Sequence, residues 1–165
     1  PADEAALKSV ATVLAQDLKD LLDWNYTIRT GKPGKNDIYL SLMKPDKQLG
    51  EEGYVLTAGR YAGIEAPARQ GAFWGTRSLL QILYNEKGQL PKGVARDWPQ
   101  YPSRCFMLDV GRKFFTMDFL RQYVKILSFY KLNEFQIHLN DNGFVQFFDN
   151  DWNKTYAAFR LESER

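Results

Sequence analysis

Apolar residues recur at three- and four-residue steps in two stretches of the first hundred residues. The first stretch, residues 5–23, predicts an amphipathic helix of about five turns. The second, residues 72–83, predicts another helix, which a polar run ending in Gly88 terminates. Short strand-like segments lie between these helices, at residues 26–29, 38–43, 54–58 and 64–68. The pattern therefore predicts an α+β layer pair, a sheet with two helices.

A strand–helix–strand pattern follows in residues 105–139. The first strand-like segment ends at Asp109, Arg112 comes three residues later, and Thr116 is placed to cap the helix. The second strand-like segment runs from residue 134 to residue 139 and leads into three polar residues. Ligands of parallel α/β proteins bind at the carboxyl ends of the strands. The pattern thus predicts a ligand site where Asp109 and Arg112 lie.

Three prolines, Pro91, Pro99 and Pro102, interrupt the segment between these two parts. Proline has no amide hydrogen and restrains the residue before it, so the stretch around Pro99 and Pro102 cannot lie inside a helix. We expect the chain to divide here, into a small α+β domain at residues 1–98 and a β-α-β part at residues 99–165.

The composition narrows the class of protein. Lys and Arg together number 22 against 20 Asp and Glu, and no long basic run occurs, so we expect no nucleic-acid partner. No apolar run approaches the roughly 20 residues that cross a bilayer, and the first residues show no signal-peptide segment. Cys105 is the single cysteine, which excludes an internal disulfide and a multi-cysteine metal site. We expect no metal and no cofactor.

Several motifs occur in a fixed order along the chain. Residues 53–56 (GYVL) and 71–81 (GAFWGTRSLLQ) come first, and residues 97–104 connect them to the later motifs. Residues 104–112 (RCFMLDVGR) and 130–141 (YKLNEFQIHLND) follow. Together they resemble family 20 glycoside hydrolases, the β-N-acetylhexosaminidases. The resemblance implies a small α+β domain, a sheet with two helices, followed by the start of an incomplete (β/α)8 barrel.

The resemblance implies roles for the polar residues that follow the two strands. Arg112 matches an arginine that binds hydroxyls of the terminal amino sugar, a task suited to the rigid fork of donors on a guanidinium. Alternatively, Arg112 does not bind the sugar and only forms a salt bridge at the end of the strand. Asp109 would contact the substrate, or else orient Arg112 and accept hydrogen bonds from nearby amides. Asp141 matches an aspartate of the polar network that supports the catalytic acid, or is an ordinary loop carboxylate. His138 is expected to be a hydrogen-bonded strand residue rather than a catalyst.

Four aromatic residues that follow the second strand-like segment of this part allow two interpretations. They would form a platform for a sugar ring, or pack as ordinary loop or core residues. They are Phe144, Phe147, Phe148 and Trp152. Two other positions depart from the family pattern: Cys105 stands where glycine is usual, and Asn142 stands where a second aspartate is common.

Catalysis in this family uses the acetamido group of the substrate, which an aspartate orients while the adjacent glutamate acts as the acid. The resemblance places that pair beyond residue 165, so no catalytic residue is expected within the chain. We therefore expect a fragment of a longer enzyme that hydrolyses terminal N-acetylhexosamine residues of glycans by substrate-assisted retaining catalysis. The chain alone is expected to be inactive. The alternative is a non-catalytic carbohydrate-binding or scaffold module with the same fold.

The resemblance also implies an N-acetylhexosamine-containing glycan as the partner and an extracytoplasmic location. An unfinished barrel would leave a sheet edge and an apolar helix face uncovered. We therefore expect copies of the chain to self-associate through that open edge.

Overall fold

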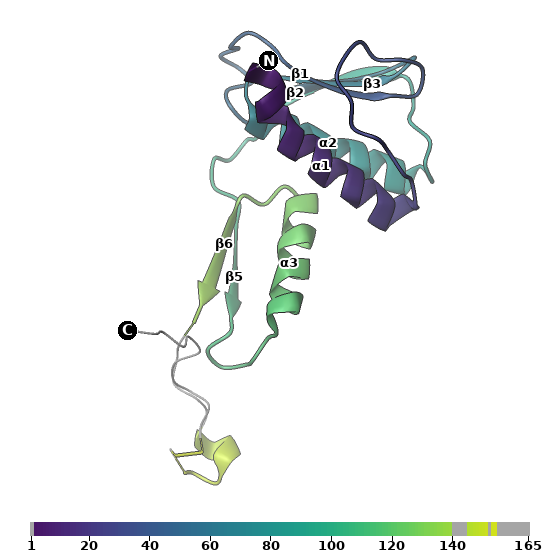
Figure 1. Ribbon diagram of the computed structural model, residues 1–165. Helices are drawn as coiled ribbons and strands as arrows, with labels where there is room; N and C mark the ends of the chain where they lie inside the picture. The colour runs from purple at the N-terminus through teal and green to yellow at the C-terminus, as the bar shows by residue number, and fades with distance from the viewer. Residues whose placement is uncertain (1, 140–144, 152, 155–165) are drawn as a thin grey trace. The chain divides into compact units, whose positions relative to one another are not determined.

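The computed structural model describes residues 2–139, 145–151 and 153–154, which form two compact units that divide after Pro102 (Figure 1). The elements of the first unit are α1 (Ala2–Leu22), β1 (Ile38–Leu42), β2 (Tyr54–Ala58), β3 (Ala62–Ala66), α2 (Arg69–Asn85) and β4 (Gly93–Asp97). Those of the second are β5 (Cys105–Asp109), α3 (Met117–Phe129), β6 (Glu134–His138) and a 3-10 turn at Val145–Phe148. No helix in this described part of the chain is long and apolar enough to span a membrane.

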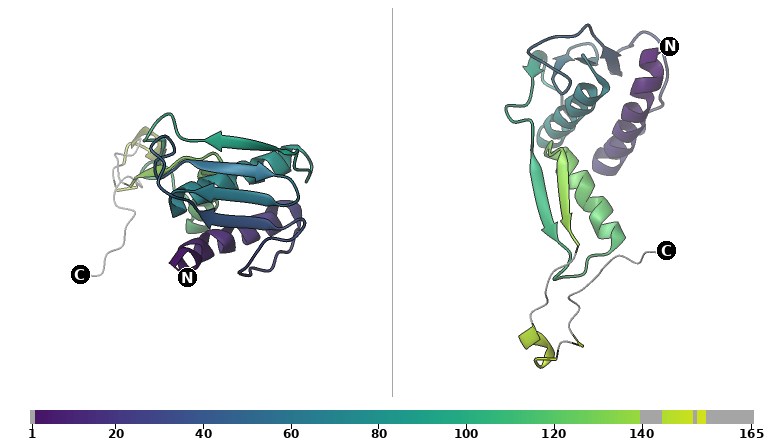
Figure 2. Two further views of the ribbon diagram at one scale, coloured as in Figure 1. Left: turned by 90° about the horizontal axis from the view of Figure 1, so that it is seen from above. Right: turned by 90° about the vertical axis from the view of Figure 1, so that its left-hand side faces the viewer.

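The first unit is a mixed four-stranded sheet with both of its helices on one face (Figures 1 and 2). The strand order is β1-β3-β2-β4. β3 runs parallel to β1 and antiparallel to β2, which is also antiparallel to β4. Ile64 of β3 lies in register between Leu40 and Leu56 and has no exposed surface. The predicted α+β layer pair is therefore present.

The core of this unit lies between the helices and the sheet. One face of α1 buries Leu7, Val10, Leu14 and Leu18 at the three- and four-residue steps of a helix, and each is at most 7% exposed. The facing side of α2 buries leucines as well. Each fully buried side chain of this size contributes about 1.5–3 kcal/mol through removal from water. Apolar periodicity alone thus accounts for both helices and for the face that each presents to the sheet.

Two glycines let α2 approach the sheet closely. A Cβ on Gly75 would lie 2.5 Å from Cγ2 of Ile64 and 3.1 Å from the ring of Tyr54. A Cβ on Gly71 would lie 2.1 Å from the carbonyl oxygen of Gly53. Any side chain at these positions would push the helix away from the strands, so glycine sets the spacing between the two layers.

A buried charge joins the two helices. Arg77 of α2 is 2% exposed, and its Nη1 donates to Oδ2 of Asp17 on α1 at 2.5 Å. Its Nε and Nη2 donate to Oγ1 of Thr76, and the guanidinium carbon lies 4.6 Å from the ring centre of Phe73. Burial lowers the pKa of Arg77, and the bonded carboxylate opposes that effect. The guanidinium is therefore held in place by hydrogen bonds and by charge.

Tyr54 links three elements of the sheet layer. Its hydroxyl donates to Oδ2 of Asp97 on β4 at 2.6 Å and lies 2.6 Å from Oγ of Ser78 on α2. Burial raises the pKa of Tyr54, and the neighbouring Asp97 raises it further. The phenol thus remains protonated and keeps β2, β4 and α2 connected.

Three details of the sheet differ from the sequence-based prediction. Residues 26–29 form no strand, and Tyr26 and Ile28 are 38% and 46% exposed. The pattern predicts no strand between the second helix and residue 104, yet Gly93–Asp97 form β4 and pair along the whole of β2. β3 begins two residues before the predicted start. A strand requires backbone pairing with a neighbour, which the local side-chain pattern does not specify.

The second unit has the predicted strand–helix–strand order. β5 and β6 are parallel, and their register runs from Cys105 opposite Glu134 to Asp109 opposite His138. Thr116 caps α3 as predicted, because its Oγ1 accepts a hydrogen bond from the amide of Phe119 at 3.2 Å. Helix and strands therefore follow from local signals that the sequence carries.

Aromatic rings hold α3 against one face of these strands. The ring of Tyr123 lies 5.4 Å from that of Phe106 on β5 and 5.9 Å from that of Phe135 on β6. Met107, which points to the opposite face because side chains alternate along a strand, is 56% exposed. Parallel sheets are normally covered on both faces. One face of this two-stranded sheet is therefore open in the described part of the unit.

We predict that Gly75→Ala destabilises the first unit by about 2 kcal/mol, because overpacking of the helix–sheet contact outweighs the better helix propensity of alanine. Urea unfolding followed by tryptophan fluorescence measures this, since three of the four tryptophans lie in this unit. Gly59→Ala is the control, because a Cβ there would meet nothing within 4 Å. A Gly75→Ala protein as stable as the parent chain would contradict the steric argument.

We predict that Asp17→Asn costs about 3 kcal/mol of unfolding free energy, because it leaves the charge of Arg77 buried without its counter-charge. The same urea titration applies. Asp20→Asn on the same helix serves as the matched control, since Asp20 is exposed and an amide there still accepts a hydrogen bond from Gln16. If the two variants lost equal amounts of unfolding free energy, the Asp17–Arg77 ion pair would contribute nothing particular to stability.

Candidate functional site

The carboxyl ends of β5 and β6 bring two titratable residues to neighbouring positions. Asp109 ends β5, His138 ends β6, and the two are directly opposite in the parallel register. Each lies three positions after an aromatic residue that contacts α3, Phe106 in one strand and Phe135 in the other. Since side chains alternate along a strand, Asp109 and His138 lie on the sheet face away from α3. This is the open face.

Arg112 returns to Asp109 through a short turn. The amide of Arg112 donates to Oδ1 of Asp109 at 3.0 Å, and its Nη1 lies 3.6 Å from Oδ2 of the same carboxylate. The Arg112 side chain is 44% exposed and that of Asp109 is 29% exposed. The carboxylate therefore orients a guanidinium that a ligand from solution can reach. Such a fork of donors suits paired oxygen atoms.

The backbone of β6 fixes the turn after β5. The amides of Val110 and Gly111 both donate to the carbonyl oxygen of His138, each at 3.0 Å. Val110 is 6% exposed and anchors the turn in the small core of this unit. The direction in which Arg112 leaves the strand is thus set by a neighbouring strand and not by the turn alone.

Arg104 fixes the opposite end of the same strand pair. Its amide donates to Oδ1 of Asn133 at 2.8 Å, and its Nε donates to the carbonyl oxygen of Lys131 at 2.7 Å. These bonds tie the start of β5 to the turn that leads into β6. Sequence reasoning used Arg104, Lys131 and Asn133 only as motif positions and assigned them no structural role.

The structure brings together two of the three substrate-binding residues that the sequence predicts. Asp109 and Arg112 are in contact, and Asp109 adopts the orienting geometry that was one of its two alternatives. Contact of either residue with a substrate stays a prediction. Asp141 lies outside the described residues. His138 lies within β6, as expected, and its carbonyl accepts two hydrogen bonds.

Two of the four aromatic residues that allow either a sugar platform or ordinary packing, Phe147 and Phe148, lie in the described part of the chain. Phe147 is 76% exposed in the 3-10 turn, so its ring is not packed in a core. Phe144 and Trp152 lie outside the described residues. In the described ranges, no three His, Cys, Asp or Glu side chains gather in a way that could hold a metal ion.

Two family profiles match the chain. The profile of glycosyl hydrolase family 20, domain 2, matches residues 1–98. The profile of the glycosyl hydrolase family 20 catalytic domain matches residues 101–148, which include β5, α3 and β6. The candidate site at Asp109 and Arg112 falls within the second match.

Curated relatives and solved structures agree with these profiles. A β-hexosaminidase of Porphyromonas gingivalis is 33% identical over 147 residues, which is 82% of this chain and 19% of that protein. A β-N-acetylhexosaminidase of Cellulomonas fimi is 30% identical over 79% of this chain and 27% of its own length. A mutant Streptomyces plicatus β-hexosaminidase in complex with its product GlcNAc has a TM-score of 0.72 at 29% identity, over 82% of this chain and 28% of that one. The chain thus spans between 19% and 28% of the length of these proteins.

Proposed function

The chain belongs to glycosyl hydrolase family 20, and from that premise we propose that it is part of a β-N-acetylhexosaminidase that removes terminal N-acetylhexosamine residues from glycans. The observation that carries the proposal is the Asp109–Arg112 pair on the open face of β5 and β6. It lies at the carboxyl ends of parallel strands, inside the stretch that matches the catalytic domain.

In this proposal Arg112 donates hydrogen bonds to adjacent hydroxyls of the terminal sugar. Asp109 acts as a positioning residue, since its carboxylate accepts from the Arg112 amide and lies beside the guanidinium. Asp141 belongs to the polar network that supports the catalytic acid. Hydrogen bonds from a charged donor contribute about 1.5–3 kcal/mol each, so a two-bond contact is enough to select a sugar.

The proposal extends to the fold of the whole enzyme. Residues 1–98 form the small α+β domain, and residues 99–165 begin a (β/α)8 barrel. The open face of β5 and β6 supports this, because closure of a barrel would cover it with side chains from further strands. The exposed Met107 on that face is of the apolar kind that fills barrel interiors.

The chemistry itself would be substrate-assisted and retaining. In such a mechanism an aspartate orients the acetamido group, and an adjacent glutamate protonates the leaving oxygen. We place both groups in the longer polypeptide, so the 165-residue chain contributes sugar-binding residues and no acid. We also propose that the enzyme acts outside the cytoplasm.

We predict that Arg112→Ala in the complete open reading frame lowers kcat/KM by about 100-fold, because two charged hydrogen bonds to the sugar are lost. Arg112→Lys should lose about tenfold, since an ammonium cannot offer the same fork. Hydrolysis of a chromogenic N-acetylglucosaminide provides the measurement. Arg121→Ala is the matched control, because Arg121 is an exposed arginine of α3 that pairs with Asp118.

Unchanged kinetics in Arg112→Ala would remove Arg112 from the proposed site. Binding of N-acetylglucosamine without any turnover by the complete protein would favour the non-catalytic binding module. Turnover by rigorously purified 165-residue chain would overturn the assignment of the acid to the longer polypeptide.

We also predict that the isolated chain self-associates through β5 and β6, because in the described part of the second unit these two strands make up the whole sheet, so each is an edge strand, and one sheet face is open. Light scattering after size-exclusion chromatography should give a mass above 19.1 kDa that rises with concentration. Met107→Glu places a charge on the open face and should shift the protein toward the monomer, whereas Val94→Glu on exposed β4 should not. A concentration-independent monomer would contradict this prediction.

A further inference from the structure

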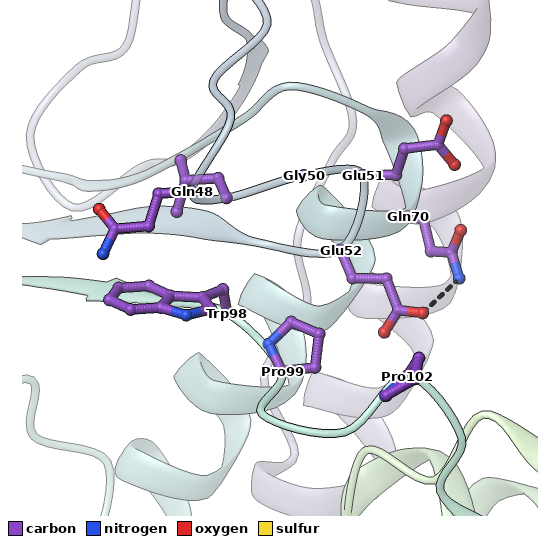
Figure 3. Close-up of a pocket in the computed structure, with 9 residues that line it drawn as sticks. Gln48, Gly50, Glu51, Glu52, Gln70, Trp98, Pro99 and Pro102 are labelled. Atoms are coloured by element: carbon purple, nitrogen blue, oxygen red, sulfur yellow. Dashed lines mark hydrogen bonds between the residues drawn. The ribbon is translucent and has the colours of Figure 1, made fainter.

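A surface pocket of about 320 Å³ lies in the first unit, at the edge of the sheet layer (Figure 3). Three segments of the chain line it: the loop at residues 48–52, the first turn of α2, and residues 98–102. Pockets of about this size and larger hold small molecules in proteins. Sequence patterns gave no sign of this pocket, because its walls come from three segments that lie far apart along the chain.

The walls of this pocket are fixed by hydrogen bonds. Oδ1 of Asp46 accepts from the amides of Gln48 and Leu49 at 2.9 and 3.1 Å, and from Arg96 of β4 at 2.8 Å. Leu49 is 2% exposed and anchors the loop in the core. The amide of Gly71, at the start of α2, donates to the carbonyl oxygen of Glu51 at 2.8 Å. The pocket is therefore built before any ligand arrives, which reduces the entropy lost on binding.

The lining combines one flat aromatic surface with planar polar groups. The indole of Trp98 is half-buried, and Figure 3 shows it with Gln48 toward one end of the pocket. Glu52 and Gln70 lie toward the other end, where Nε2 of Gln70 donates to Oε1 of Glu52 at 3.1 Å. Among the described residues, those that line the pocket include no lysine or arginine. An anionic ligand would therefore meet carboxylates and no counter-charge.

This combination matches the chemistry of a sugar ring. A pyranose has one face of C–H groups, which carry partial positive charge and are attracted to the negative face of an aromatic ring. Its rim carries hydroxyls, each both a donor and an acceptor. Glutamine offers an acceptor and two donors, and glutamate accepts from hydroxyls. A neutral, hydroxyl-rich ligand therefore satisfies both the indole and the amide and carboxylate groups.

We propose that this pocket binds a pyranose unit of a glycan, with the sugar stacked on Trp98 and its hydroxyls bonded to Gln48 and to the Glu52–Gln70 pair. The site is built entirely from the first unit, and no step of the proposed hydrolysis uses it. Only the choice of an acetamido sugar as the probe rests on the proposed function. The small domain would then bind a glycan chain independently of the proposed site at Asp109 and Arg112.

The test is an NMR titration of the 165-residue chain with chitotriose, observed through the Trp98 indole N–H and the amides of residues 48–52. We expect saturable shifts there with a Kd on the order of 1 mM, as for a shallow pocket with few contacts. Trp98→Ala should weaken binding about tenfold or more, and Trp98→Phe should retain most of it because a ring remains. Gln48→Ala should weaken binding by about threefold to tenfold.

Gln16→Ala is the control for Gln48→Ala, because Gln16 is a glutamine of α1 outside the pocket and its change should leave the Kd as it was. Gln48 is exposed, so its variant folds even where Trp98→Ala does not. Shifts that never saturate, or a Kd that neither Gln48→Ala nor Trp98→Ala alters, would overturn the proposal. Failure of the complete protein to hydrolyse an N-acetylglucosaminide would overturn the proposed function and leave this binding result standing.

Discussion

The in-register parallel pairing of β5 with β6 creates the candidate site. It puts Asp109 directly opposite His138 and lets the His138 carbonyl accept from two amides of the turn after β5. That turn carries Arg112 back to the carboxylate of Asp109. A shift of one residue in the register would turn these side chains to the face that α3 covers. The contacts of the Tyr123 ring with Phe106 and Phe135 stabilise the observed register against such a shift.

A different constraint organises the first unit. Gly71 and Gly75 allow α2 to lie against β2 and β3 at a distance that no side chain would permit. At that distance Tyr54 reaches both Ser78 and Asp97, and the start of α2 reaches the loop that ends at Gly53. The pocket beside Trp98 is a consequence of this packing, since one of its walls is the first turn of α2. Close helix–sheet packing thus supplies both stability and a preformed concave surface.

Local signals in the sequence were sufficient for much of this structure. Both helices of the first unit follow from apolar periodicity, and α3 follows from periodicity together with the Thr116 cap. The parallel strand pair follows from the strand–helix–strand pattern, whereas the pairing of Arg112 with Asp109 was one of two alternatives that the family resemblance left open. The strand at Gly93–Asp97 could not be predicted from local signals, because most of its side chains are exposed and only its hydrogen bonds to β2 define it. The segment at residues 26–29 has the composition of a strand and forms none.

The sequence by itself determined the family, the helices, and the residue types at the ends of β5 and β6, because these depend on neighbours within a few positions or on motifs. The tertiary structure alone decided which carbonyl fixes the turn before Arg112, that Arg77 is buried against Asp17, and that Trp98 faces a pocket with Gln48. Each of these joins positions far apart in the chain. The physical reason is that hydrogen bonding and burial depend on distances in space, which spacing along the sequence does not specify.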